Sequence, residues 1–154
     1  MEKLNCTINE ITDSIEDLIS EGAVIPVYVS GSSMNPFLIS RRDIVYLESV
    51  GDNDVKAGRI LLVRRKSGSL VLHRVRKINS DGTIVLNGDA QSWCETAERN
   101  QVIAAVCEID RKGKKRSADS FYWKSINLVW KLLVPFRSII MRVWNKIKRM
   151  KSNR

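Results

Sequence analysis

"ILLVRRKSGSLVLHRVRKINSDGTIVLNGD", residues 60–89, is the stretch that decides the fold class of this chain. Three runs rich in Val, Ile and Leu are separated by "KSGS" and "NSDGT". Short segments of Gly, Ser, Asn and Asp between such runs are typical of β-hairpin turns, because Gly adopts the positive φ angles that tight turns require. The stretch therefore predicts three consecutive antiparallel strands.

The neighbouring sequence continues the same pattern on both sides. "VIPVYVSG" (24–31) and "RDIVYLESV" (42–50) precede the stretch, and "QVIAAVCEIDR" (101–111) follows it. About six short strands joined by tight turns predict a mainly β domain over residues 23–111, a small antiparallel β-barrel-like or folded sheet. No internal repeat and no Rossmann or P-loop signature accompanies these strands.

Helices are predicted at both ends of the chain. Within residues 1–22, apolar side chains recur at helical spacing before Gly22, the expected stop, and predict a short amphipathic helix. These side chains are Ile8, Ile11, Ile15, Leu18 and Ile19. After a predicted basic linker at 112–120, residues 121–154 predict a second amphipathic helix, which Pro135 should kink.

Charge is divided unevenly along the 154 residues. Residues 1–110 hold 12 Lys and Arg against 16 Asp and Glu, a net charge of −4, whereas residues 111–154 hold 14 against one, a net charge of +13. This asymmetry indicates an anionic partner for the C-terminal segment.

Cysteine usage and the N-terminus bear on the compartment. The cysteines Cys6, Cys94 and Cys107 are odd in number and include no C-x-x-C pair, so neither a disulfide framework nor a zinc site is predicted. The first residues lack the basic and apolar regions of a secretory signal, and no apolar run approaches the ~18 residues of a membrane span. We expect a cytoplasmic protein that needs no metal and no cofactor.

The C-terminal segment combines a basic stripe with an apolar face. Lys124, Lys131, Arg142 and Arg149 fall on one side of a continuous helix. The opposite side would carry Ile126, Val129, Trp130, Leu133, Ile140, Trp144 and Ile147. The pattern predicts that residues 121–150 lie on an anionic membrane surface. The alternative is a helix docked on the β domain, and nucleic acid is not expected as a partner.

Candidate chemistry lies in "VSGSSMNPFL" (29–38) and at the single histidine, His73. Three serines follow a strand at a sharp bend, which is also ordinary turn composition. His73 shares one face of its predicted strand with Val71 and Val75, so it is either a buried structural histidine or a general base that activates a serine. Asp89, at a strand end, is either a turn residue or the carboxylate that orients the imidazole.

Five short motifs, in order, resemble the catalytic domain of type I signal peptidases. Gly31–Pro36 resembles the Gly-x-Ser-Met-x-Pro motif, with Val29-Ser30 before it as in LexA-type self-cleaving repressors. Arg42–Val45 resembles the Gly-Asp-Ile-Val motif, and Lys56–Ile60 resembles a second copy of it. Leu72–Val75 resembles the His-Arg-Val motif of the endoplasmic-reticulum and archaeal enzymes, and Asn87–Asp89 resembles the closing Gly-Asp motif. The order, rather than any single motif, carries the resemblance.

The resemblance implies a role for each matching residue. Ser33 is the nucleophile and His73 the general base, with Asp89 as the first candidate for the orienting carboxylate and Glu95 as the second. The oxyanion would be held mainly by the Ser33 backbone N–H. Because the position two residues before Ser33 is Gly31, which has no hydroxyl, Ser32 or a backbone group is expected to supply the second donor.

Two positions depart from the family's motifs. Arg42 replaces the glycine of the first Gly-Asp motif, and Arg59 replaces the aspartate of the second. Neither position is catalytic by resemblance, so both replacements are expected to alter the surface rather than the activity. An acidic helix also stands where typical signal peptidases have a membrane span.

The resemblance implies a serine endopeptidase that cleaves a signal, leader or precursor peptide after a small residue. We expect it to act in the cytoplasm, peripherally bound to a membrane. The alternative is a catalytically inactive binding module of the same fold at the membrane surface. A self-cleaving transcriptional regulator is disfavoured, since the residues before the β domain are too few for a helix-turn-helix and no Ala-Gly or Cys-Gly site precedes Ser33.

Overall fold

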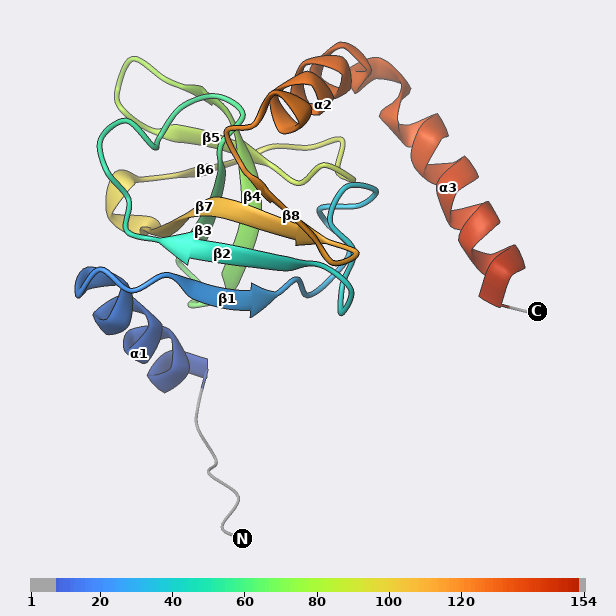
Figure 1. The fold of residues 1–154 in the computed structure, drawn as a ribbon. Helices are drawn as coiled ribbons and strands as arrows, with labels where there is room; N and C mark the ends of the chain where they lie inside the picture. The colour runs from blue at the N-terminus through green and yellow to red at the C-terminus, as the bar shows by residue number, and fades with distance from the viewer. Residues whose placement is uncertain (1–7, 153–154) are drawn as a thin grey trace, which may run out of the picture.

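The computed structural model describes residues 8–152, so that Cys6 lies outside the described part. Within it, an antiparallel sheet of eight strands has α1 beside β1 and α2 at its other side, while α3 projects away from the sheet (Figure 1). The helices are α1 (Ile8–Ser20), α2 (Phe121–Leu132) and α3 (Arg137–Ser152), with short 3-10 turns at Arg99–Gln101 and Val134–Phe136. The strands are β1 (Ile25–Tyr28), β2 (Ile44–Glu48), β3 (Ile60–Arg64), β4 (Leu70–Ile78), β5 (Ile84–Asn87), β6 (Glu95–Ala97), β7 (Val102–Arg111) and β8 (Lys114–Ser117).

The sheet runs in the order β1-β2-β7-β3-β4-β5-β6, with β8 paired to β7. Register shifts interrupt the β2–β7, β3–β7 and β4–β5 pairs. Each such bulge bends a strand and increases its twist, so the sheet curves. It does not close into a barrel, because β1 and β6 stand at the two ends of the pairing order.

The two hairpins predicted from residues 60–89 are confirmed. β3 pairs with β4 up to Arg64 opposite Leu70, and β4 pairs with β5 up to Ile78 opposite Ile84. Gly68 and Gly82 have φ angles of 84° in these turns, a conformation that glycine adopts without steric cost.

Alternate residues of the central strands enter two separate cores. Ile60 of β3 belongs to a core closed by Ile19 of α1 and Trp123 of α2, whereas Leu61 belongs to a second core within the curve of β3 to β7. A strand with both faces covered reads as a continuous apolar run, as "ILLV" does.

The segment predicted as a linker, 112–120, is not a linker throughout, because Lys114–Ser117 form strand β8. β8 pairs with β7, with Arg111 opposite Lys114. Lys112 and Gly113 form the two-residue turn with φ angles of 57° and 75°, both of the sign that a type I′ hairpin requires. All four residues of β8 are exposed, and three of them are Lys or Arg. Their composition is that of a linker, and therefore it does not indicate a strand.

The C-terminal segment breaks at Pro135, as predicted, and most of its predicted apolar face is turned toward the protein, although Val129 and Ile147 are exposed. Trp123 and Trp130 of α2 are 3% and 5% exposed, and the Trp130 ring contacts Phe37 edge-on at 4.9 Å between centroids. Five of the seven residues predicted to face a membrane are buried or half-buried: Ile126, Trp130, Leu133, Ile140 and Trp144. The docked-helix alternative therefore describes α2.

Candidate active site

The serine cluster lies on the loop between β1 and β2, which backbone hydrogen bonds hold at its base. The Val29 N–H donates to the Asp43 carbonyl at 3.0 Å, and the Arg41 N–H donates to the Val29 carbonyl at 2.9 Å. The Asp43 carboxylate accepts from the Ile39 N–H and pairs with Arg42. The first Gly-Asp motif thus supports the loop, and its Arg42 forms an ion pair with the neighbouring Asp43.

The loop presents Ser33 above a buried base. Met34 is 2% exposed and Leu38 is fully buried in the core below, whereas Ser33 itself is half-buried. Gly31 has a φ of 78°, a backbone conformation that strongly favours glycine at this bend.

A cleft of about 640 Å³ opens beside this loop, and both Ser33 and His73 line it. One wall is the loop, another is the first half of β4, and a third comes from α3 through Met141 and Asn145. The predicted nucleophile and base are thus brought to one cavity, although forty residues of sequence separate them.

His73 is buried, with 1% of its surface exposed, and faces a carboxylate. Its Nδ1 lies 2.5 Å from Oε1 of Glu95 in an electrostatic contact without regular hydrogen-bond geometry. Burial lowers the pKa of His73 below its ordinary value of 6.5, and the Glu95 charge, which raises it, only partly offsets this effect. The imidazole is therefore neutral at neutral pH, as a general base must be.

Glu95 is fixed by Arg65, which approaches it with two nitrogens. Arg65 Nε and Nη2 donate to the two carboxylate oxygens at 2.8 and 3.0 Å. Burial raises the pKa of the Glu95 carboxyl, but the hydrogen bonds from Arg65 and the charges of His73 and Arg65 outweigh it, so this pKa lies below its ordinary value. Glu95 thus remains an anion over the physiological pH range.

Asp89, the first candidate for orienting His73, is engaged elsewhere, and that prediction is wrong. Its carboxylate accepts two hydrogen bonds from Arg74, at 2.9 and 2.7 Å, and both residues are buried. Its carbonyl accepts from the Trp130 indole N–H at 2.9 Å. Successive residues of a strand face opposite sides, so Arg74 draws Asp89 to the side away from His73. The second candidate, Glu95, is the carboxylate that contacts His73.

Asn87 and Gly88 of the closing motif, together with Ala90 after it, position Ser33. The Ser33 carbonyl accepts a hydrogen bond from the Ala90 N–H at 2.8 Å. A Cβ on Gly88 would lie 2.7 Å from that carbonyl oxygen, closer than any side chain tolerates. The Asn87 amide donates to the Gln91 carbonyl at 3.1 Å and so shapes the turn that holds Ala90.

The hydroxyl and the backbone N–H of Ser33 make no hydrogen bond within residues 8–152. No hydrogen bond therefore joins Ser33 Oγ to the His73 imidazole in this conformation. Catalytic hydrogen bonds are often long in ligand-free enzymes and tighten when substrate binds. The free N–H is available to an oxyanion, and Gly31 and Ser32, the other predicted donors, stand exposed at the rim of the same cleft.

We expect conservative amide substitutions to separate the roles of the two carboxylates. Glu95→Gln should lower kcat about 10²–10⁴-fold, because the imidazole loses the charge that stabilises its protonated form. Its unfolding free energy should fall by only about 0–1 kcal/mol, since the Arg65 pair is partly exposed.

Asp89→Asn should instead cost about 3–5 kcal/mol of stability by leaving Arg74 buried without a counter-charge. Urea titration and peptide-cleavage kinetics on both variants measure the difference; a fully active Glu95→Gln variant would contradict this assignment.

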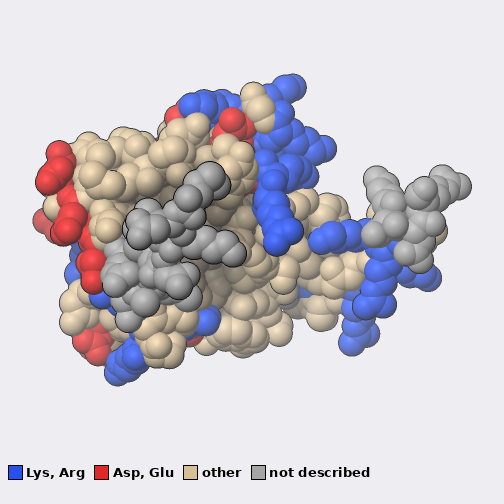
Figure 2. Space-filling view, turned by 90° about the horizontal axis from the view of Figure 1, so that it is seen from below, with Lys and Arg blue, Asp and Glu red and all other residues tan. Residues whose placement is uncertain are grey.

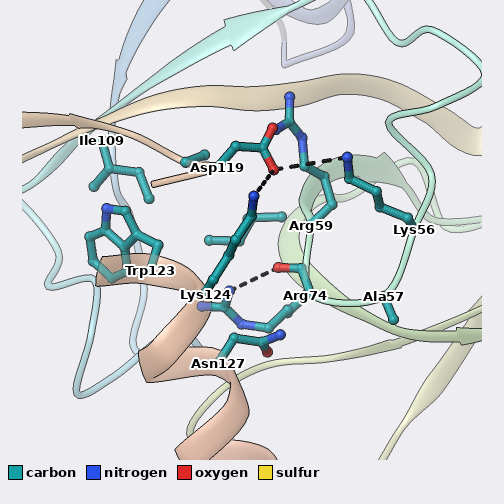
Figure 3. Close-up of a pocket in the computed structure, with 12 residues that line it drawn as sticks. Lys56, Ala57, Arg59, Arg74, Ile109, Asp119, Trp123, Lys124 and Asn127 are labelled. Carbon is teal, nitrogen blue, oxygen red and sulfur yellow. Dashed lines mark hydrogen bonds and ion pairs between the residues drawn. The ribbon is translucent and has the colours of Figure 1, made fainter. Parts of the chain in front are cut away.

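A second cavity, of about 310 Å³, lies between α2 and the β3–β4 region (Figure 3). Lys56, Arg59 and Lys124 converge on the Asp119 carboxylate, which Arg59 approaches at 2.6 Å. Arg59 is only 7% exposed and also pairs with Glu48 at 3.0 Å. The expectation that Arg59 would alter only the surface is therefore wrong, because it ties β3 to the segment preceding α2.

Three residues of the cleft region were not anticipated from the sequence. Arg65 belongs to a hairpin turn, and its role depends on the distance between that turn and β6. Met141 and Asn145 belong to a helix that the sequence did not bring to the cleft. In the described part of the chain, no three His, Cys, Asp or Glu side chains converge as a metal site.

Comparison with known proteins adds no relative. No family model, no curated protein and no solved structure matches the chain. The candidate site therefore stands on the geometry of its own residues.

Proposed function

We propose that the protein is a serine endopeptidase of signal-peptidase type. The observation that carries the proposal is the shared cleft: Ser33 and His73 line it together, and the far nitrogen of His73 faces the anchored Glu95 carboxylate. In this proposal the curved sheet is the counterpart of the β-barrel-like catalytic domain of that family.

The proposed reaction begins with transfer of the Ser33 hydroxyl proton to the neutral His73 imidazole. Ser33 Oγ attacks the scissile carbonyl, and the Ser33 N–H hydrogen-bonds the oxygen that becomes negative. His73 then gives its proton to the departing amine, leaving an acyl group on Ser33. Water, deprotonated by His73, releases the acyl group and restores the hydroxyl. Glu95 stabilises the imidazolium in both halves of the reaction.

Two strand edges beside the cleft suit an extended peptide. β1 is the end strand of the sheet and pairs only with β2 within residues 8–152. The first half of β4 pairs with β3 but has no partner on its other side, because pairing with β5 begins at Arg74. Backbone groups at either edge can hydrogen-bond an added strand. The preference for a small side chain before the cleaved bond is what the resemblance to signal peptidases implies.

A peptide library read by mass spectrometry tests this proposal. We expect the protein to cleave extended peptides after Ala, Gly or Ser, and a Ser33→Ala preparation to leave them intact. Preference for bulky or charged residues at that position would contradict the proposed specificity.

The missing Ser33–His73 hydrogen bond favours one alternative, an inactive module that binds peptides in the same cleft. A serine-directed acylating reagent separates the two functions, because only an activated hydroxyl forms a stoichiometric adduct. An intact mass that stays unchanged, together with peptide binding, would establish the module and exclude the peptidase.

A further inference from the structure

The C-terminal helix carries a second apolar stripe that the protein body does not cover. Ile139, Val143, Ile147 and Met150 are 58%, 53%, 46% and 65% exposed. At about 100° per residue these four positions lie within about 80° of one another on α3. The half-buried face of the same helix, which includes Ile140, Met141 and Trp144, adjoins the stripe on one side.

Three more exposed apolar side chains lie in the residues that lead into α3. Phe136 in the 3-10 turn is 55% exposed, and Leu132 and Leu128 of α2 are 71% and 61% exposed. Single exposed apolar residues are ordinary on protein surfaces, but seven within residues 128–150 mark an interaction surface. We name these seven residues the exposed stripe.

The charges around the exposed stripe are all of one sign. Residues 121–154 contain nine Lys and Arg and no Asp or Glu. Arg142, Lys146 and Arg149 border the stripe on one side of α3, and within residues 8–152 none of them forms an ion pair. Figure 2 shows basic side chains along the projecting segment and acidic side chains gathered at the opposite end of the molecule.

We propose that the exposed stripe seats α3 on an anionic lipid membrane, with the helix lying in the plane of the interface. A long apolar face bordered by unpaired cations matches the interfacial region of such a membrane, where acyl chains lie below anionic headgroups. A protein partner would need a matching acidic groove, whereas a bilayer accommodates a stripe of any length. None of the described helices is both long and apolar enough to cross a bilayer.

Membrane binding through the exposed stripe does not depend on the proposed peptidase activity. If both hold, the peptidase cleft lies near the membrane surface. Met141 and Asn145 line the cleft from the side of α3 away from the stripe. A helix is about 10 Å across, so the cleft would lie close to the lipid headgroups and meet membrane-bound peptides.

Vesicle co-sedimentation of the full chain tests the inference. We expect binding to vesicles of phosphatidylcholine with phosphatidylglycerol, little binding to phosphatidylcholine alone, and weaker but remaining binding at high salt. The double variant Ile139→Asp/Val143→Asp should lower the partition coefficient at least about tenfold, because two charges enter the apolar contact. The matched control is Ile78→Asp, an isoleucine with 47% exposure at the far end of β4, which should bind as the wild type does.

The outcome that overturns the inference is equal pelleting of the double variant and the wild type. Equal binding to neutral and anionic vesicles would also overturn it, since the cations would then contribute nothing. If the wild type fails to bind vesicles and sediments as a dimer that the double variant abolishes, the stripe serves a second copy of the chain instead. Circular dichroism on each variant verifies that the helices remain folded.

Discussion

Replacing Ser33 with alanine should lower kcat on the order of 10⁶-fold, the largest effect of any single substitution in this chain. Removing the nucleophile of a serine peptidase costs about as much as removing its whole catalytic set, because the residues act as a unit. The hydroxyl of Ser33 makes no hydrogen bond within the described residues, so its loss should change the unfolding free energy by no more than about 0.5 kcal/mol. Cleavage of a fluorogenic peptide and a urea titration measure the two quantities.

Ser32→Ala is the matched control for this experiment. Ser32 lies one residue earlier on the same loop and is exposed at the rim of the cleft. Its alanine variant should lose at most the 10²–10³-fold that a single oxyanion donor typically contributes, far less than the loss expected for Ser33→Ala. Should Ser33→Ala remain active and Ser32→Ala be dead, the nucleophile would have to be reassigned.

His73→Ala should have the second largest effect, a fall in kcat of about 10⁴-fold or more. The wild-type pH profile carries the more specific prediction. Catalysis needs the neutral imidazole, so kcat/KM should rise with pH as His73 loses its proton. Because burial, only partly offset by Glu95, holds the pKa of His73 below its ordinary value of 6.5, the rise should occur at a lower pH than the titration of a free histidine.

The Glu95→Gln variant tests the cause of this profile. The Glu95 charge raises the pKa of His73, so its removal should move the rising limb to lower pH. A purely structural role for Glu95 would leave the limb in place. A wild-type profile that is flat from pH 5 to 8 would show that another group supplies the base.

Both central hairpins and their turn glycines were predictable from residues 60–89, because strand alternation and hairpin turns depend on near neighbours in sequence. The inward face of His73 follows from the same alternation, as does the helix that ends before Gly22. Ser33 and His73 could be paired in advance only through the order of the resembling motifs, since no local rule joins residues forty positions apart. β8 escaped prediction because its exposed Lys and Arg match the composition of a linker.

Choices between equivalent partners were decided by the tertiary structure alone. Asp89 ends the closing motif and Glu95 follows it in sequence, but Arg74 binds the first carboxylate. Arg65 holds the second, which faces His73. The helical pattern of residues 121–150 has apolar residues on more than one side, and only the tertiary structure shows which of them, such as Trp130, are buried and which, such as Ile139, are exposed. A sequence pattern predicts which face of a helix or strand a side chain occupies. Which residue it contacts there is decided by long-range packing and by competition among charged side chains for the few buried positions that can pair them.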